Sequence, residues 1–129
     1  MIVTDASAVL DVLLHPSDVP ALVERILTSG DAVAAPDLLD VEVLSVLRRW
    51  ERRGEISARR GGQVLDDLQL LPIVRHPARP LVRAAWALRH TLTAYDAQYV
   101  ALAKALSATL ATTDGRMAKA ARAAGVQAV

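Results

Sequence analysis

Two aspartates lie at the ends of short apolar runs that are typical of buried strands. Asp5 follows the run MIVT, and Asp114 ends the run ATLATTD. Ligands of open parallel sheets bind outside the carboxyl ends of the strands, so both carboxylates are expected at one edge of a sheet. Asp is also a common N-cap where a strand turns into a helix, which would explain either residue alone. The two together favour a site.

Two further acids lie in predicted helices. Glu42 lies in a helix predicted over 38–53, at the margin of an apolar face that includes Leu39 and Val43. A carboxylate that is partly removed from water favours a bound cation, and the alternative is a solvated position on the helix flank. Asp96 lies at the start of a helix predicted over 94–106, where an acid also favours the positive helix end.

The elements that would position these acids alternate between strands and helices. Strands are predicted at 1–4, 32–36, 71–76 and 108–114, with a short terminal strand at 126–129. Helices are predicted at 7–14 with Ser7 as N-cap, 17–28, 38–53 with Asp37 as N-cap, 58–71 after Ser57, 78–91, 94–106 and 115–125. Such alternation requires crossover connections and therefore predicts an α/β fold with a parallel sheet covered on both faces. We expect residues 1–129 to form a single domain.

Composition excludes several classes of protein. The chain is 53% hydrophobic without Phe, so Leu, Val, Ile and Ala must fill the core. It has no Cys, which excludes disulfides, thiolate catalysis and zinc sites built from Cys. No apolar run is long enough to span a bilayer. We expect a soluble, cytoplasmic protein without a membrane partner.

The arginines are the second group of residues with possible chemistry. The net charge is only +1, but thirteen of the fifteen basic residues are Arg, whose fork suits phosphate. Arg49 and Arg53 lie close to one helical line with Glu42, so Arg49 is a candidate phosphate contact, as is Arg116. Ion pairs with neighbouring acids are the alternative for both residues. A solvated or partner-binding face is expected for the other arginines of this region, Arg48, Arg52, Arg59 and Arg60.

Four motifs in order carry a resemblance to a known family. They are MIVTDASAVL, APDLLDVEVLSVL, LTAYDAQYVALAKAL and LATTDGRMAKAA. Together they resemble the PIN-domain toxins of VapBC-type toxin–antitoxin pairs over nearly the whole chain. The resemblance implies a three-layer fold with four to five short parallel strands between helices. It assigns the acidic positions of the family to Asp5, Glu42, Asp96 and Asp114, and small polar positions beside them to Ser7 and Thr112. Some relatives have a further acid near the last one, where this chain has Gly115 and Arg116.

The chemistry implied is hydrolysis of RNA at a metal site. Four converging carboxylates repel one another unless a cation neutralises them, and Mg²⁺ or Mn²⁺ prefers such oxygen ligands. Zinc is not expected, because His15, His76 and His90 are isolated in the sequence. Asp5, Asp96 and Asp114 are expected as direct or water-mediated ligands, and Glu42 as a ligand or as the group that orients the attacking water. The number of metal ions stays open.

The resemblance also implies partners. An antitoxin of the VapB type is expected to cover the acids and to place a basic side chain against them, and the toxin is expected to be a homodimer. The alternatives are a housekeeping RNA-processing nuclease with the same chemistry and a binding module that retains the fold. A phosphoacceptor receiver domain is a further rival, but it needs adjacent acids after the first strand and a late Lys at a strand end. Asp5 is alone at its position, and neither Lys104 nor Lys119 is at a strand end.

Overall fold

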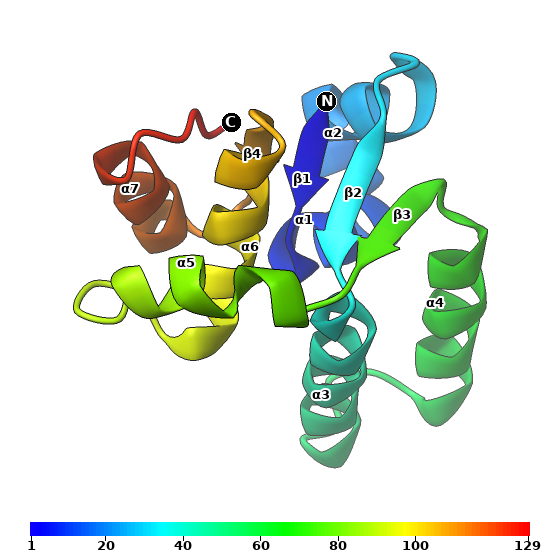
Figure 1. Cartoon of the computed structure of the whole chain (residues 1–129). Helices are drawn as coiled ribbons and strands as arrows, with labels where there is room; N and C mark the ends of the chain where they lie inside the picture. The colour runs from blue at the N-terminus through cyan, green and yellow to red at the C-terminus, as the bar shows by residue number, and fades with distance from the viewer.

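A computed structural model describes residues 1–129 and shows a four-stranded sheet between helices (Figure 1). The strands are β1 (Ile2–Thr4), β2 (Val33–Pro36), β3 (Ile73–His76) and β4 (Thr109–Ala111). They are all parallel in the order β3-β2-β1-β4. Ile2 of β1 pairs with Val33 on one side and with Thr109 on the other. The carboxyl ends of β1 and β4 are therefore neighbours at one edge of the sheet.

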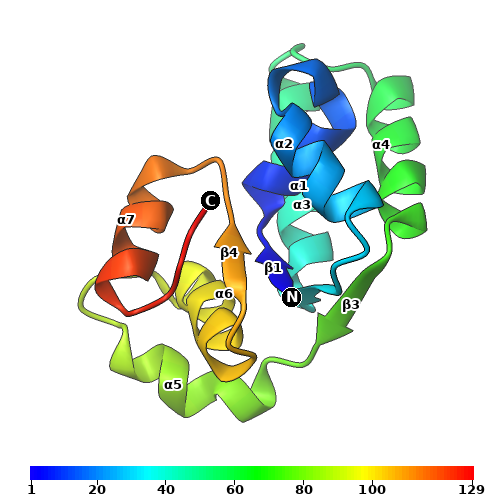
Figure 2. The ribbon, with the colours of Figure 1, turned by 90° about the horizontal axis from the view of Figure 1, so that it is seen from above.

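The helices cover both faces of this sheet (Figure 2). On one face, α1 (Ala6–Leu14), α3 (Leu38–Arg52) and α4 (Ala58–Leu70) pack against one another, with the short α2 (Pro20–Val23) beside α1. On the other face, α6 (Ala94–Ala105) crosses β1, β2 and β4, and α5 (Val82–Ala87) packs on α6. The last helix, α7 (Gly115–Ala123), follows β4. The predicted α/β fold with a covered parallel sheet is confirmed.

The core explains why the strands are so apolar. All three residues of β1 are fully buried, and Ile2, Val3 and Thr4 are β-branched residues that favour extended backbone. On α3, Leu39, Val43 and Leu47 recur every four residues and form its buried stripe. Arg75 of β3 joins the sheet to α3 by a bidentate ion pair with Asp40, with N–O distances of 2.7 and 3.1 Å. No helix of the chain is long and apolar enough to cross a membrane.

Two predicted helix caps differ from the structure. The N-cap of α1 is Asp5, not Ser7: Asp5 has extended backbone, and its carboxylate accepts a hydrogen bond from the Ala8 amide at 2.9 Å. Asp37 precedes α3 with helical backbone angles and no side-chain bond to the helix, so it does not act as the predicted cap. Ser57 does cap α4, and Thr93 caps α6 through the Asp96 amide.

Several predicted elements are shorter or more irregular in the structure, among them the strand predicted over 108–114, which is only β4 (Thr109–Ala111). The helix expected over 17–28 divides into a 3₁₀ turn (Pro16–Asp18), α2 and a π turn (Glu24–Thr28), because Pro20 forces a restart. The helix expected over 78–91 divides likewise into a 3₁₀ turn (Arg79–Leu81) and α5, and ends at Ala87. The terminal strand at 126–129 is only an isolated bridge between Leu110 and Ala128. The sheet thus has four strands, and the tail covers the free edge of β4.

Candidate active site

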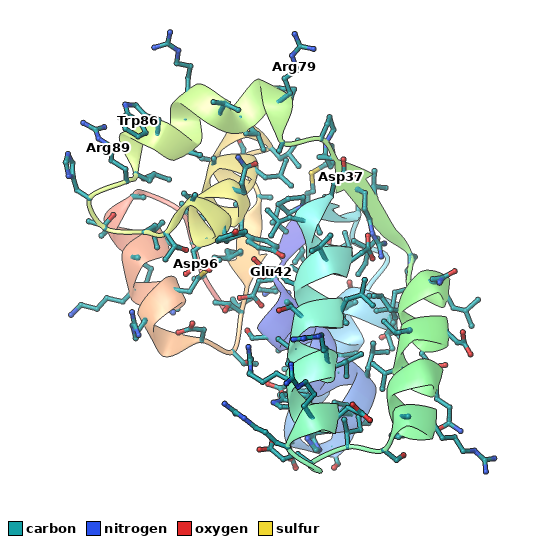
Figure 3. The ribbon with its side chains drawn as sticks, turned by 90° about the horizontal axis from the view of Figure 1, so that it is seen from below. Asp37, Glu42, Arg79, Trp86, Arg89 and Asp96 are labelled. Carbon is teal, nitrogen blue, oxygen red and sulfur yellow. The ribbon has the colours of Figure 1, made fainter.

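The four candidate acids line one hollow of about 330 Å³ at the carboxyl ends of β1 and β4. Asp5 follows β1, Glu42 lies on α3, Asp96 lies in the first turn of α6, and Asp114 follows β4. Figure 3 shows Glu42 and Asp96 side by side between α3 and α6. The sheet edge and two helices thus bring together acids that are up to 109 positions apart in the chain.

Asp5 is the most buried of the four, with 5% of its surface exposed. Its Oδ1 accepts hydrogen bonds from the Ala8 amide and from Ser7 Oγ at 2.8 Å, and its Oδ2 accepts one from Thr112 Oγ1. Burial raises the pKa of Asp5 above its usual range, the charge of Asp114 adds to the rise, and the three hydrogen bonds oppose it. The three hydrogen bonds hold the carboxylate in one orientation.

Ser7 and Thr112 link the ends of β1 and β4. Each hydroxyl donates a hydrogen bond to the Asp5 carboxylate. Each hydroxyl oxygen also accepts a hydrogen bond from a backbone amide: Thr113 N donates to Ser7 at 3.2 Å, and Asp114 N donates to Thr112 at 3.0 Å. The two hydroxyl oxygens are 3.3 Å apart. These small polar residues therefore orient Asp5 and the backbone at Asp114, next to the acids as the resemblance implies.

Asp114 combines a cap with an open oxygen. Its Oδ1 accepts hydrogen bonds from the amides of Arg116 and Met117 at 2.9 and 3.3 Å, which makes it the N-cap of α7. These bonds engage one carboxylate oxygen and leave Oδ2 without a protein donor. The residue is exposed, so that oxygen is accessible to an ion, a water molecule or a substrate.

Glu42 and Asp96 both have raised pKa values, because they are partly buried and lie near other acids. Burial, followed by the charges of Asp96 and Asp5, raises the pKa of Glu42 to about 7, against a hydrogen bond from Tyr99. Burial and then the charge of Asp114 raise the pKa of Asp96, while Thr93 and the Arg116 charge lower it. Each acid thus resists ionisation partly because the others are near. A cation in the hollow would relieve this repulsion.

The donors suit a hard divalent cation, but they do not form a ready-made cage. Carboxylate and hydroxyl oxygens are the ligands of Mg²⁺ and Mn²⁺, and His and Cys are absent from the lining. No three His, Cys, Asp or Glu side chains of the chain converge closely enough to enclose an ion by themselves. Mg²⁺ normally keeps several waters and takes one or two carboxylates together with substrate phosphate. The residues therefore fit an open, partly hydrated ion.

Some lining residues were not identified from the sequence. Tyr99 lies in the helix predicted over 94–106; its hydroxyl donates a hydrogen bond to Glu42 at 3.3 Å, and burial raises the pKa of Tyr99 so that it stays a donor. Asp11 also lines the hollow, one helical turn after Ser7, and that spacing was a usable signal. Arg49 lines the hollow, whereas Arg116 acts on Asp96 through its charge and is not part of the lining.

The sequence pattern of the PIN domain matches residues 2–123 of this chain. The chain belongs to the PIN-domain family. Several of its relatives are VapC ribonucleases. Ribonuclease VapC1 of Mycobacterium tuberculosis is 44% identical over 119 residues, which cover 92% of this PIN domain and 89% of VapC1. Ribonuclease VapC3 of the same organism is 40% identical over 119 residues, covering 92% and 86%. The resemblance to VapC-type PIN toxins is thereby confirmed.

Solved structures share the fold of this PIN domain. PAE2754 from Pyrobaculum aerophilum superposes with a TM-score of 0.72 at 21% identity, over 100% of this chain and 83% of that one. FitAcB from Neisseria gonorrhoeae gives a TM-score of 0.66 at 21% identity, over 99% and 96%. At such identities the likeness concerns the fold alone, and it includes the parallel sheet whose edge carries the acids.

Proposed function

We propose that this PIN domain is a metal-dependent endoribonuclease and the toxin of a type II toxin–antitoxin pair. One observation carries the proposal: four acids from four separate elements line a single hollow at the sheet edge, in a chain about 40% identical to VapC ribonucleases. Four clustered carboxylates would repel a polyanion unless a cation intervened. A divalent ion would balance the negative charge of the hollow and would allow a phosphodiester to bind there.

In this proposal the residues of the hollow divide the work. Asp5, Asp96 and Asp114 hold Mg²⁺ or Mn²⁺ directly or through water, and Ser7 and Thr112 keep Asp5 in place. Glu42 accepts a hydrogen bond from Tyr99, which leaves its other carboxylate oxygen to orient the attacking water. The bound ion supplies positive charge for the phosphate oxygens and lowers the pKa of water. Arg49, on the wall of the hollow, contacts a phosphate.

The catalytic proposal is tested with purified protein and single-stranded RNA. Cleavage is expected with Mg²⁺ or Mn²⁺ and should cease in excess EDTA. Asp96→Asn should lower the rate at least about 100-fold, because it removes one of the three carboxylates proposed to hold the ion. Asp67→Asn on the exposed side of α4 is a matched control and should cleave normally. Cleavage that persists in EDTA would refute the metal mechanism, and RNA binding without cleavage would favour the binding module.

The regulatory part of the proposal is an antitoxin over the acids. Its supports are the VapC relatives and the hollow itself, in which an Arg of the partner would match the charge of the ion. Expression of the wild type alone should arrest growth, and co-expression of the neighbouring gene product should restore it. Asp96→Asn should not be toxic. A wild type that cleaves RNA without arresting growth would favour the housekeeping nuclease.

The homodimer is proposed on the surface of α5. Val82 and Trp86 are 57% and 63% exposed, and with Leu92 they line a hollow of about 660 Å³ between α5 and the start of α6. Exposed apolar side chains around a hollow are typical of protein contacts. Trp86→Glu should convert a dimer to a monomer in sedimentation equilibrium. Leu70→Glu, at an exposed apolar position on α4, is the control that should leave the dimer intact.

A further inference from the structure

A second hollow, entirely polar, lies beside the acidic one on α3. It has a volume of about 410 Å³ and is lined by Ser45, Arg48, Arg49, Arg52 and Arg53. Arg49 lines both hollows, so the two adjoin. We call the four arginines with Ser45 the arginine hollow. No carboxylate belongs to its lining.

The four arginines share one side of α3 because of their spacing. Residues three, four, seven and eight positions apart return to one side of a helix, and Arg48, Arg49, Arg52 and Arg53 follow Ser45 at those steps. Helical periodicity places Arg49 and Arg53 close to the line of Glu42, and predicts a separate solvated or partner-binding face for Arg48 and Arg52. The structure brings the two pairs together around Ser45.

These arginines have no partners within the protein. All four are exposed, and none forms an ion pair or a side-chain hydrogen bond. By contrast, Arg75 is paired with Asp40, and Arg60 bonds to Gln63 and to the Leu13 carbonyl. The negative end of the α3 dipole favours cations in the last turn, but that effect is weak and does not require four of them around one depression. Four adjacent guanidinium groups repel one another, and an anion would relieve the repulsion.

The position of the hollow indicates which anion. Eleven residues separate Glu42 from Arg53, roughly 16 Å along the helix axis. An RNA strand whose scissile phosphate lies among the acids would pass along α3 and bring further phosphates to the arginines. Guanidinium groups bind phosphate with two parallel hydrogen bonds, and such contacts fix the register of a strand without reading its bases.

We propose that the arginine hollow is a phosphate-binding subsite that holds the RNA on one side of the scissile bond. The proposal rests on the proposed ribonuclease function and extends it: the substrate must reach beyond the cleaved linkage. An oligonucleotide too short to reach Arg52 and Arg53 should therefore bind weakly even if its cleavage site is ideal. Sequence preference should be unaffected by the subsite.

Binding is measured in the Asp96→Asn background, so that no RNA is consumed. The test variant carries Arg48→Gln and Arg52→Gln, which leave Arg49 of the acidic hollow unchanged. The matched control carries Arg59→Gln and Arg79→Gln, two exposed arginines on α4 and in the 3₁₀ turn before α5, so that net charge is the same. Fluorescence anisotropy gives the Kd for a 3-nucleotide and a 15-nucleotide single-stranded RNA over a range of salt concentrations. Thermal unfolding verifies that all variants fold.

For the 15-nucleotide RNA, the test variant should bind about tenfold more weakly than the control. The slope of log K against log salt concentration should become less steep by about 1.4, which is near 0.7 for each lost phosphate contact. For the 3-nucleotide RNA the two variants should be equal. In the cleaving wild-type background, Arg48→Gln with Arg52→Gln should raise the KM for long RNA and leave kcat nearly unchanged.

Equal losses in the test and control variants would show a general effect of charge and overturn the subsite. Normal RNA binding combined with weaker binding of the neighbouring gene product would assign the hollow to the antitoxin instead. If the wild type cleaves RNA and the test variant is indistinguishable from it, the subsite alone is wrong. If the wild type neither binds nor cleaves RNA with Mg²⁺ or Mn²⁺, the ribonuclease proposal fails and the subsite fails with it.

Discussion

The Tyr99 hydroxyl donates a hydrogen bond to Glu42 Oε2 at 3.3 Å and joins α6 to α3 across the floor of the acidic hollow. Tyr99 is fully buried, whereas Glu42 is half-buried. The bond stabilises the ionised carboxylate in surroundings that otherwise favour its protonated form. The two residues are 57 positions apart in the chain, so this contact depends on the packing of both helices against the sheet.

Tyr99→Phe should raise the pKa of Glu42 above its value of about 7, because it removes the group that opposes burial. The loss of one hydrogen bond should also cost about 1 kcal/mol of unfolding free energy. The pKa is measured from the carboxyl ¹³C shift of Glu42 in metal-free protein. Tyr95→Phe is the control, since Tyr95 is exposed and does not bond to Glu42. An unchanged Glu42 titration in Tyr99→Phe would refute the role of this bond.

Glu42→Gln should change how stability depends on pH in the metal-free protein. The carboxyl has a usual pKa of 4.5 and a folded pKa of about 7, so the folded state binds more protons between these values. Stability therefore falls as pH rises through that window, and the cost is absent below it. Because Glu42 is partly exposed, screening should limit the effect to about 1 kcal/mol. Urea unfolding at pH 5 and pH 8 should show a smaller difference in Glu42→Gln than in the wild type.

Asp5→Asn and Asp5→Ala should separate catalysis from folding. Asn retains an acceptor for the Ala8 amide and carries no buried charge, so its stability should be close to that of the wild type while RNA cleavage is lost. Ala removes the cap and leaves Ser7 and Thr112 without an acceptor, which should cost about 2 kcal/mol. Chemical denaturation and an RNA cleavage assay measure the two effects. Near-normal cleavage by Asp5→Asn would remove Asp5 from the site.

Thr112→Ser and Thr112→Val should differ because the hydroxyl, and not the methyl group, links Asp5 to the Asp114 amide. Val keeps the shape and leaves a buried carboxylate oxygen without its donor, which should cost about 2 kcal/mol and lower the cleavage rate at least about tenfold. Ser should retain most of the rate. Equal activity of the two variants would show that the contact does not position Asp5.

Mg²⁺ should stabilise the wild type against heat. An ion present at ten times its Kd adds about 1.4 kcal/mol and should raise the Tm by roughly 5 °C in a domain of this size. Because Asp5, Glu42 and Asp96 have raised pKa values, binding should also release protons, which calorimetry in two buffers detects. Asp96→Asn should lose most of the shift, and Asp67→Asn should keep it. An equal shift in both variants would place the ion elsewhere.

Local patterns in the sequence were sufficient for part of this architecture. An apolar β-branched run followed at once by an acid predicts both a buried strand and a carboxylate at its end, and Asp5 occupies that place after β1. Asp114 lies three residues after β4 ends at Ala111, but it still lines the same hollow. The spacing of Leu39, Val43 and Leu47 predicts α3 and leaves Glu42 at the margin of its buried stripe. These inferences succeed because backbone periodicity and strand ends are properties of adjacent residues.

Competing local signals explain the errors. Ser7 has the chemistry of an N-cap, but α1 begins at Ala6 with Asp5 as its cap, so Ser7 lies inside the helix and its hydroxyl donates to Asp5 instead. Segment 126–129 has the composition of a strand, yet Gly125 turns the chain with φ of 85° and only one bridge to β4 forms. In both cases the residue type was compatible with the predicted element, but contacts with neighbouring residues favoured a different structure.

The sequence by itself predicted the strand–helix alternation and four of the five acids that line the hollow, all except Asp11. Only the tertiary structure decided that Glu42 and Asp96 face one hollow, that Tyr99 bonds to Glu42, and which side of α3 gathers the arginines. Such relations join residues far apart in the chain, and they depend on how α3 and α6 rotate as their apolar stripes pack on the two faces of the sheet. Helical periodicity determines which residues share one face of a helix. Only the packing of that helix against the other elements determines which face points toward the hollow.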